Sequence, residues 1–213
     1  MIFRLAVLGA SLVSFLLTYY KQKKHEEKMV ELQQQQHKVE DDVWYKFIFI
    51  TNENSGCTEH LRQEESCGDK CSHNYLQTIR QHVRSAKASI SLCIYHVTLA
   101  TILQELTEAH SRQIVVRVIS DREMDYHHAS ITKKLKEKGI ALKIQPDTQT
   151  FMHHKFLLID ENTDDKEVWF GSLNLTAQAL TTNCENMMYT NNASMVSDFS
   201  KCFEMLWESF SDL

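Results

Sequence analysis

The stretches SISLCIYHV (89–97) and IVVRVIS (114–120) decide the fold of this chain. Both are short, apolar and rich in β-branched residues, as expected of buried strands. The segment between them repeats apolar residues at the spacing of one helix face: Leu99, Ile102, Leu103 and Leu106. A strand, a helix and a second strand in this order predict a βαβ unit.

The same alternation continues on both sides of this unit. Further strands are expected where short apolar runs recur: 43–50, 140–144, 151–160, 168–172 and 186–190. Helices are expected at 75–86, over a lysine-rich segment at 128–138, and at the C-terminus. The C-terminal helix has one apolar face: Val196, Phe199, Phe203, Leu206 and Phe210. This pattern predicts an α/β sandwich, in which helices cover both faces of a mixed sheet.

Length and composition suit one folded domain with appendages. The chain has 213 residues, 43% of them hydrophobic, with only one proline and five glycines, so long Pro/Gly linkers are absent from the sequence. The net charge of -5 argues against a broad basic surface for bulk capture of nucleic acid. Any phosphate site must therefore be locally basic.

The N-terminus has the pattern of a membrane anchor. Residues 5–20 carry no charge and are followed by three lysines within 21–24, so the run can just span a bilayer with the rest of the chain in the cytosol. A cleaved secretory signal is the alternative. A short anchor with a basic flank also suits the mitochondrial outer membrane. The expected organisation is a single-pass anchor at 1–20, a charged juxtamembrane stalk at 21–42 and a folded domain at 43–213.

The string HHKFLLID (153–160) carries the strongest signal for chemistry. On a strand, positions two apart share a face, so His153 and Lys155 project together whereas His154 points away. A neutral imidazole can attack phosphorus, and an ammonium beside it can neutralise the phosphate oxygens. A histidine satisfied within the core is the alternative, but an unpaired lysine buried on the same face would be costly. The pair therefore predicts a phosphoryl-transfer site.

Two later strings add polar groups to this site. GSLN (171–174) ends the next predicted strand, where Ser172 and Asn174 offer neutral donors to phosphate. NCEN (183–186) opens the following strand, and Glu185 could hold the second imidazole nitrogen and fix its tautomer.

Residue types that bind metals gather in segment 51–73: Cys57, His60, Cys67, Cys71 and His73. Because cysteines stay reduced in the cytosol, four of these residues could close a tetrahedral zinc site that staples a long loop. The two histidines are rival ligands, and a loop without metal is the alternative. The remaining cysteines are expected to be ordinary buried residues: Cys93, Cys184 and Cys202.

The combination of H-x-K-x4-D at 153–160 with GSxN at 171–174 resembles the phospholipase D superfamily and, within it, the single-motif, membrane-anchored enzymes of the Zucchini type. The resemblance covers most of 43–213. It implies a phospholipase D-like α/β/α sandwich with one HKD motif per chain, and hence a homodimer in which two His153 side chains face each other across a twofold axis. One His153 would form a phosphohistidine, while the other protonates the leaving oxygen and then activates water.

The resemblance also implies roles for the other site residues. Lys155 and Asn174 would bind the phosphate, and Glu185 would orient the histidine. Asp160 would support the strand more than it touches substrate. No catalytic metal is required, but a structural zinc ion is implied, with the ligands Cys57, Cys67, Cys71 and His73.

The resemblance implies two candidate substrates. One is single-stranded RNA, cut by an endoribonuclease of piRNA biogenesis that works beside piRNA-pathway proteins at the mitochondrial surface. The other is the mitochondrial membrane lipid cardiolipin, hydrolysed to phosphatidic acid. A lipase should have an apolar acyl channel near His153, and the sequence has no long apolar loop near either motif, so RNA is favoured. An inactive membrane tether for partner proteins is a third possibility, against which the intact motif weighs.

Overall fold

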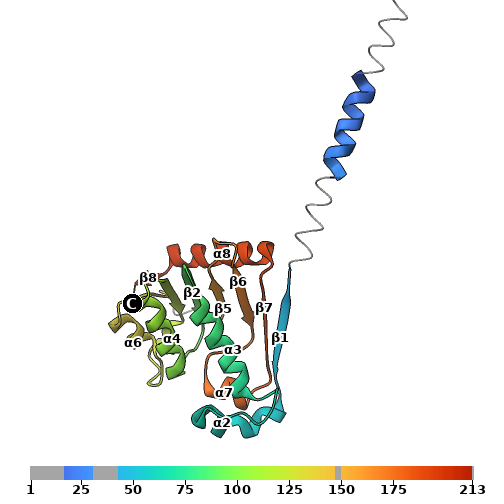
Figure 1. The fold of residues 1–213 in the computed structure, drawn as a ribbon. Helices are drawn as coiled ribbons and strands as arrows, with labels where there is room; N and C mark the ends of the chain where they lie inside the picture. The colour runs from blue at the N-terminus through green and yellow to red at the C-terminus, as the bar shows by residue number, and fades with distance from the viewer. Residues whose placement is uncertain (1–16, 31–42, 147–149, 213) are drawn as a thin grey trace, which may run out of the picture. The chain divides into compact units, whose positions relative to one another are not determined.

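The computed structural model describes residues 17–30, 43–146 and 150–212 (Figure 1). The chain divides into two units between Val43 and Trp44. In the first unit, residues 17–30 form an exposed helix. Most of the predicted anchor and stalk, residues 1–16 and 31–42, lies outside the described residues. Within the described part, no helix combines the length and the apolar character needed to cross a membrane.

The second unit is built on an eight-stranded sheet with the order β1-β7-β6-β5-β2-β3-β4-β8. The strands are β1 (Tyr45–Ile50), β2 (Ser89–Ile94), β3 (Val115–Ser120), β4 (Ala141–Ile144), β5 (Lys155–Ile159), β6 (Glu167–Gly171), β7 (Glu185–Thr190) and β8 (Ser211–Asp212). The βαβ units make β2, β3 and β4 parallel, whereas the remaining pairs are antiparallel. The predicted mixed sheet is therefore confirmed.

Helices cover both faces of this sheet (Figure 1). The helical segments are η1 (Asn52–Cys57), α2 (Thr58–Gln63), α3 (Ser72–Ser85), α4 (Ala100–Ser111), α5 (Arg122–Asp125), α6 (Thr132–Glu137), α7 (Ala177–Thr181) and α8 (Ala193–Ser209). One apolar core lies between the sheet and α3 and α4. A second core lies under α8, whose predicted apolar face supplies Val196 and Phe203, packed with Phe156 of β5. The amphipathic pattern of each helix thus selects the face that it covers.

Several elements of the structure differ from the prediction. The strand expected at 151–160 begins only at Lys155, because β5 pairs with β2 from Lys155 opposite Ile94 onwards. The lysine-rich helix is shortened to α6, since the Asp125 carboxylate accepts a hydrogen bond from the Thr132 hydroxyl and holds the preceding segment in a turn. Strand β8 was not predicted, because its two residues carry no strand pattern of their own.

The topology brings several strand ends to one edge of the sheet. The parallel strands β2 and β3 end there, and β5, antiparallel to β2, begins there. Strand β6 ends at the same edge and β7 begins at it, because each runs antiparallel to its neighbour. Residues that follow β2, β3 and β6 therefore lie near those that precede β5. We use the name catalytic edge for this row of strand ends, where β2, β3 and β6 end and β5 and β7 begin.

Candidate active site

His153 and Lys155 meet at the catalytic edge, as predicted, although His153 precedes the strand. The Lys155 Nζ lies 3.1 Å from Nδ1 of His153 and donates a hydrogen bond of 2.7 Å to the His153 carbonyl oxygen. Lys155 is buried, with 8% of its surface exposed, whereas His153 is exposed. An exposed imidazole beside a fixed ammonium can reach an incoming phosphate while the ammonium neutralises its oxygens.

The surroundings keep the His153 imidazole neutral. Partial burial and then the charge of Lys155 lower its pKa below the ordinary 6.5, while Asp121 partly opposes them. Burial also lowers the pKa of Lys155, against the opposing charges of Glu185 and Cys93. A neutral imidazole retains a free nitrogen lone pair near pH 7, which a nucleophile needs.

Tyr95 is a site residue that the motifs did not reveal. The centroid of the Tyr95 ring lies 4.4 Å from that of the His153 ring, and the Lys155 Nζ lies 4.9 Å from the centroid of the Tyr95 ring. The Tyr95 N–H donates to the His154 carbonyl oxygen at 2.9 Å, which extends the pairing of β2 with the segment before β5. One aromatic ring therefore contacts both members of the pair, including the ammonium over its face. The sequence places Tyr95 inside the expected strand 89–97, whereas β2 ends at Ile94 and Tyr95 directly follows it.

Asp121 positions the segment that precedes His153. It is almost fully buried after β3, and one carboxylate oxygen accepts from the Met152 N–H at 2.9 Å. The other oxygen accepts from the N–H groups of Glu123 and Met124 at the start of α5. A charged acceptor that holds three backbone donors fixes the two segments against each other. A buried aspartate at a strand end was available as a sequence signal but was not recognised.

The GSLN segment also lies at this edge, and its glycine has a structural reason. A Cβ at Gly171 would approach the Asn186 carbonyl oxygen to 2.2 Å, so only glycine allows β6 and β7 to pair so closely here. The Ser172 N–H then donates to the same oxygen at 2.9 Å. Two residues after Ser172, Oδ1 of Asn174 is buried and has no hydrogen-bond partner among the described residues.

Glu185 has partners other than the predicted one. Its carboxylate accepts hydrogen bonds from the Ser172 hydroxyl and, at 2.8 Å, from the side-chain amide of Asn183. No contact with His153 of the same chain is found in the described residues, so the predicted orienting role is not seen within one chain. The carboxylate instead acts on Lys155 through its charge. It also holds the Ser172 side chain in place.

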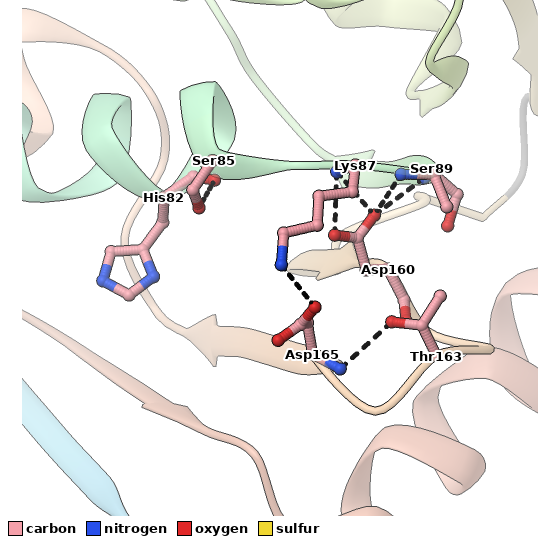
Figure 2. A network of polar contacts seen from close by, with 8 residues as sticks. His82, Ser85, Lys87, Ser89, Asp160, Thr163 and Asp165 are labelled. Carbon is pink, nitrogen blue, oxygen red and sulfur yellow. Dashed lines mark hydrogen bonds and ion pairs between the residues drawn. The ribbon is translucent and has the colours of Figure 1, made fainter.

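Asp160 lies at the opposite end of β5 from Lys155. Its carboxylate accepts hydrogen bonds from the N–H groups of Lys87, Ala88 and Ser89, at 2.9, 2.7 and 2.9 Å (Figure 2). Its backbone is left-handed, with φ of 51°, a conformation that aspartate tolerates better than most residues. The carboxylate thus ties the turn after α3 to the end of β5. This placement agrees with support of the strand and separates Asp160 from the catalytic edge.

A second group of side chains could hold a metal ion. The donor atoms of Cys57, His60, Cys67 and Cys71 lie within 4.8 Å of one another. The Cys57 sulfur lies 3.9 Å from that of Cys67 and 3.8 Å from that of Cys71. A tetrahedral ion with metal–sulfur bonds of about 2.3 Å requires sulfurs roughly 3.8 Å apart, so the spacing fits.

The histidine of this group is His60 and not the predicted His73. Helix α2, which the sequence did not predict, brings Nδ1 of His60 to 3.6 Å from the Cys71 sulfur. His73 lies in the first turn of α3 and is not a member of this group. Although burial raises it, the pKa of the Cys71 thiol is lowered to about 6 by the backbone N–H groups of Cys67 and His73 and by the side chains of Cys67 and Cys57. Of the other cysteines, Cys93 is buried as expected but Cys184 is exposed, because it lies in the turn before β7.

The sequence and the fold are similar to those of known proteins. The family model described as "Cardiolipin synthase, PLD-like domain" matches residues 79–207. The chain is 28% identical to "Mitochondrial cardiolipin hydrolase" of Chlamydomonas reinhardtii, over 76% of this chain and 73% of that protein. It is 31% identical to the protein of the same name from Danio rerio, over 72% of this chain and 68% of the relative.

Solved structures agree on the fold. Nuc of Salmonella typhimurium, a phospholipase D family member, superposes with a TM-score of 0.63 at 22% identity, covering 81% of this chain and 99% of Nuc. NucT from Helicobacter pylori superposes with a TM-score of 0.62 at 19% identity, covering 81% of this chain and all of NucT. With the family match over most of the folded unit, the chain belongs to the phospholipase D-like family and is a phosphodiesterase of the phospholipase D type.

Proposed function

We propose that the chain hydrolyses phosphodiesters by covalent catalysis at His153. The contact between the exposed His153 imidazole and the buried Lys155 ammonium is the observation that carries this proposal, and the lowered pKa of His153 favours the neutral nucleophile. A ring nitrogen attacks phosphorus and forms an N–P bond as the bond to the leaving oxygen breaks. Water then cleaves the N–P bond and returns free His153. Lys155 and Asn174 would bind the phosphate oxygens, and Ser172, held by Glu185, offers a further polar contact.

A second copy of the chain completes this mechanism. The leaving oxygen needs a proton and water needs a base, but the sequence holds one HxKx4D motif. In a homodimer with twofold symmetry, an exposed His153 of each copy can face the other across the axis. One imidazole then acts as the nucleophile, and its counterpart acts as the acid and later as the base.

The pH dependence of kcat/KM should reflect the lowered pKa of His153. Protonation removes the nitrogen lone pair, so activity is present above the pKa and is lost as the pH falls through it. Because burial and Lys155 lower this pKa, the acid limb of the profile should lie below pH 6.5. A pH series with a soluble phosphodiester at constant ionic strength measures it. An acid limb above 6.5 would contradict the proposed environment of the nucleophile.

Cardiolipin is the first candidate substrate, because the relatives of known name are called mitochondrial cardiolipin hydrolases. Cleavage of one of its phosphodiester bonds would release phosphatidic acid. Single-stranded RNA is the second candidate. Tyr126 and Phe151, on segments that flank Asp121 and His153, are 69% and 58% exposed, and such rings can stack on unpaired bases. A role in piRNA biogenesis with partner proteins of that pathway belongs to this second candidate.

The substrate is decided by a direct assay without divalent metal. The full chain in detergent micelles is incubated with cardiolipin vesicles and, separately, with labelled single-stranded RNA, with the His153→Asn variant as the blank. Phosphatidic acid release above the blank supports the lipid hydrolase, and RNA fragments above the blank support the nuclease. If neither product exceeds the blank, the catalytic proposal fails, and an inactive membrane tether for partner proteins becomes the better hypothesis.

The site of action is proposed to be the mitochondrial outer membrane. Residues 1–20 would form a single-pass anchor and 21–42 a stalk, with the catalytic domain of 43–213 facing the cytosol. The support is the uncharged run at 5–20 followed by lysines, together with the mitochondrial names of the relatives.

A structural zinc ion is proposed at Cys57, His60, Cys67 and Cys71. It would hold η1 and α2 against the start of α3, where these residues have little core of their own. We expect one zinc per chain in the purified protein by atomic emission, and at least half of it lost in His60→Ala, because one of four ligands is removed. The matched variant His73→Gln should keep its zinc. Loss of zinc in His73→Gln with retention in His60→Ala would reverse the assignment.

A further inference from the structure

Three histidines form a cluster at the catalytic edge, where His96 follows β2 and His127 and His128 follow β3 and α5, and the proposed mechanism uses none of them. The ring centroids of His96 and His127 lie 4.9 Å apart, and those of His127 and His128 lie 4.6 Å apart. His127 and His128 are exposed. The Nε2 atom of His96 is buried and has no hydrogen-bond partner among the described residues. We call these residues the histidine cluster.

Backbone contacts fix the cluster next to both halves of the site. His96 follows Tyr95, whose ring packs on His153. The His96 carbonyl oxygen accepts from the Leu175 N–H at 3.2 Å, one residue after Asn174. The backbone of His96 therefore adjoins Tyr95, which contacts the nucleophile, on one side, and Leu175, which follows the proposed phosphate-binding Asn174, on the other.

The other two histidines are tied to the same place through Asp121. This carboxylate caps α5, which leads directly to His127 and His128, and also accepts from the Met152 N–H before His153. The position of the cluster relative to the nucleophile is thus set by a buried ionic group.

The chemistry of the cluster suits an anion better than a metal ion. Imidazole N–H groups donate hydrogen bonds to phosphate oxygens, and a protonated imidazole also attracts the phosphate charge. Burial and then the charge of His127 lower the pKa of His96, so His96 contributes as a neutral donor. In the part of the chain that the structure describes, the cysteine cluster at 57–71 is the one group whose donor atoms converge closely enough for a metal. Lys133, whose Nζ lies 5.5 Å from the ring centroid of Tyr126, adds a cation over the residue that precedes His127. The carboxylate of Asp125, which lies two residues before His127, accepts a hydrogen bond from the Thr132 hydroxyl.

We propose that the histidine cluster binds a second phosphate of the substrate, next to the phosphodiester that is cleaved. The proposal rests on the proposed function, because it needs a substrate phosphate at His153. The feature that the two candidate substrates share is a pair of phosphates joined by a short carbon linker. Both cardiolipin and an RNA strand carry such a pair, whereas phosphatidylglycerol and a dinucleoside monophosphate carry only one phosphate.

The kinetic test uses the double variant His127→Asn/His128→Asn in the full chain. With cardiolipin or an RNA decamer, KM should rise about tenfold at an unchanged kcat, the size expected for loss of a charge-assisted contact. With phosphatidylglycerol, a dinucleoside monophosphate or bis(p-nitrophenyl) phosphate, KM should not change. The control His25→Asn alters an exposed histidine outside the catalytic unit and should leave all five substrates unaffected. Equal losses on one-phosphate and two-phosphate substrates, or no loss on any, would overturn the proposal.

A binding measurement tests the subsite without turnover. Calorimetry with the His153→Asn variant should show glycerol 1,3-bisphosphate binding about tenfold tighter than glycerol 1-phosphate. The double histidine substitution should abolish this advantage, and its persistence would overturn the subsite. An absence of hydrolysis by the unaltered chain, together with the predicted binding difference, would instead count against the proposed function alone.

Discussion

Replacing His153 with asparagine is expected to lower kcat by at least about a thousandfold, because the asparagine amide cannot form the N–P bond. The variant should still fold, since His153 is exposed and its side chain fills no part of either core. The measurement is release of p-nitrophenol from bis(p-nitrophenyl) phosphate by the full chain, with far-ultraviolet circular dichroism to confirm folding.

His154→Asn is the matched control. His154 is also exposed, and its carbonyl oxygen, rather than its ring, accepts from the Tyr95 N–H, so the same substitution one position along preserves that backbone contact. We expect its activity to stay within a few-fold of the unaltered chain. Equal losses in the two variants would mean that the segment, and not the His153 imidazole, is what activity requires.

Replacing Asp160 with alanine is expected to lower the free energy of unfolding by about 3–5 kcal/mol, because three backbone N–H groups lose a charged acceptor and alanine is strained at positive φ. Asp160→Asn should cost less, since asparagine tolerates this backbone and keeps one acceptor oxygen. Urea unfolding of the full chain measures both values.

Asp165→Ala provides the comparison on the same turn. Asp165 forms an ion pair of 2.6 Å with Lys87, but both side chains are more than half exposed, so its loss should change the free energy of unfolding far less than the loss of Asp160. A similar small loss in Asp160→Ala would show that water replaces the carboxylate, and that Asp160 does not hold the turn.

The elements that the sequence predicted well are those with strong periodicity. Strands β2 and β3 and the helix between them follow from local apolar spacing, which the sheet then reinforces. The short β8 has no such pattern, and its pairing with β4 depends on where α8 ends. Helix α2 likewise has no recognisable apolar pattern, because none of its six residues has a buried side chain.

The residues of the candidate site could be predicted only where they belong to a short sequence motif. His153 and Lys155 stand two positions apart, and they meet even though His153 precedes β5. Tyr95 and Asp121 follow different strands, and only the strand order brings them to His153. Sequence spacing does not contain that order. The choice between His60 and His73 likewise depended on how α2 folds back onto Cys71.

Strand β5 connects two residues of the motif that have different tasks. Lys155 stands at its first residue and Asp160 directly follows its last, so the motif spans the sheet from the catalytic edge to the opposite turn. Five steps of about 3.3 Å separate the two residues. Removing one residue between them would shorten the strand and turn every following side chain to the other face. The four residues between Lys155 and Asp160 therefore match the length of strand β5, which sets the distance between the phosphate-binding end of the motif and its structural end.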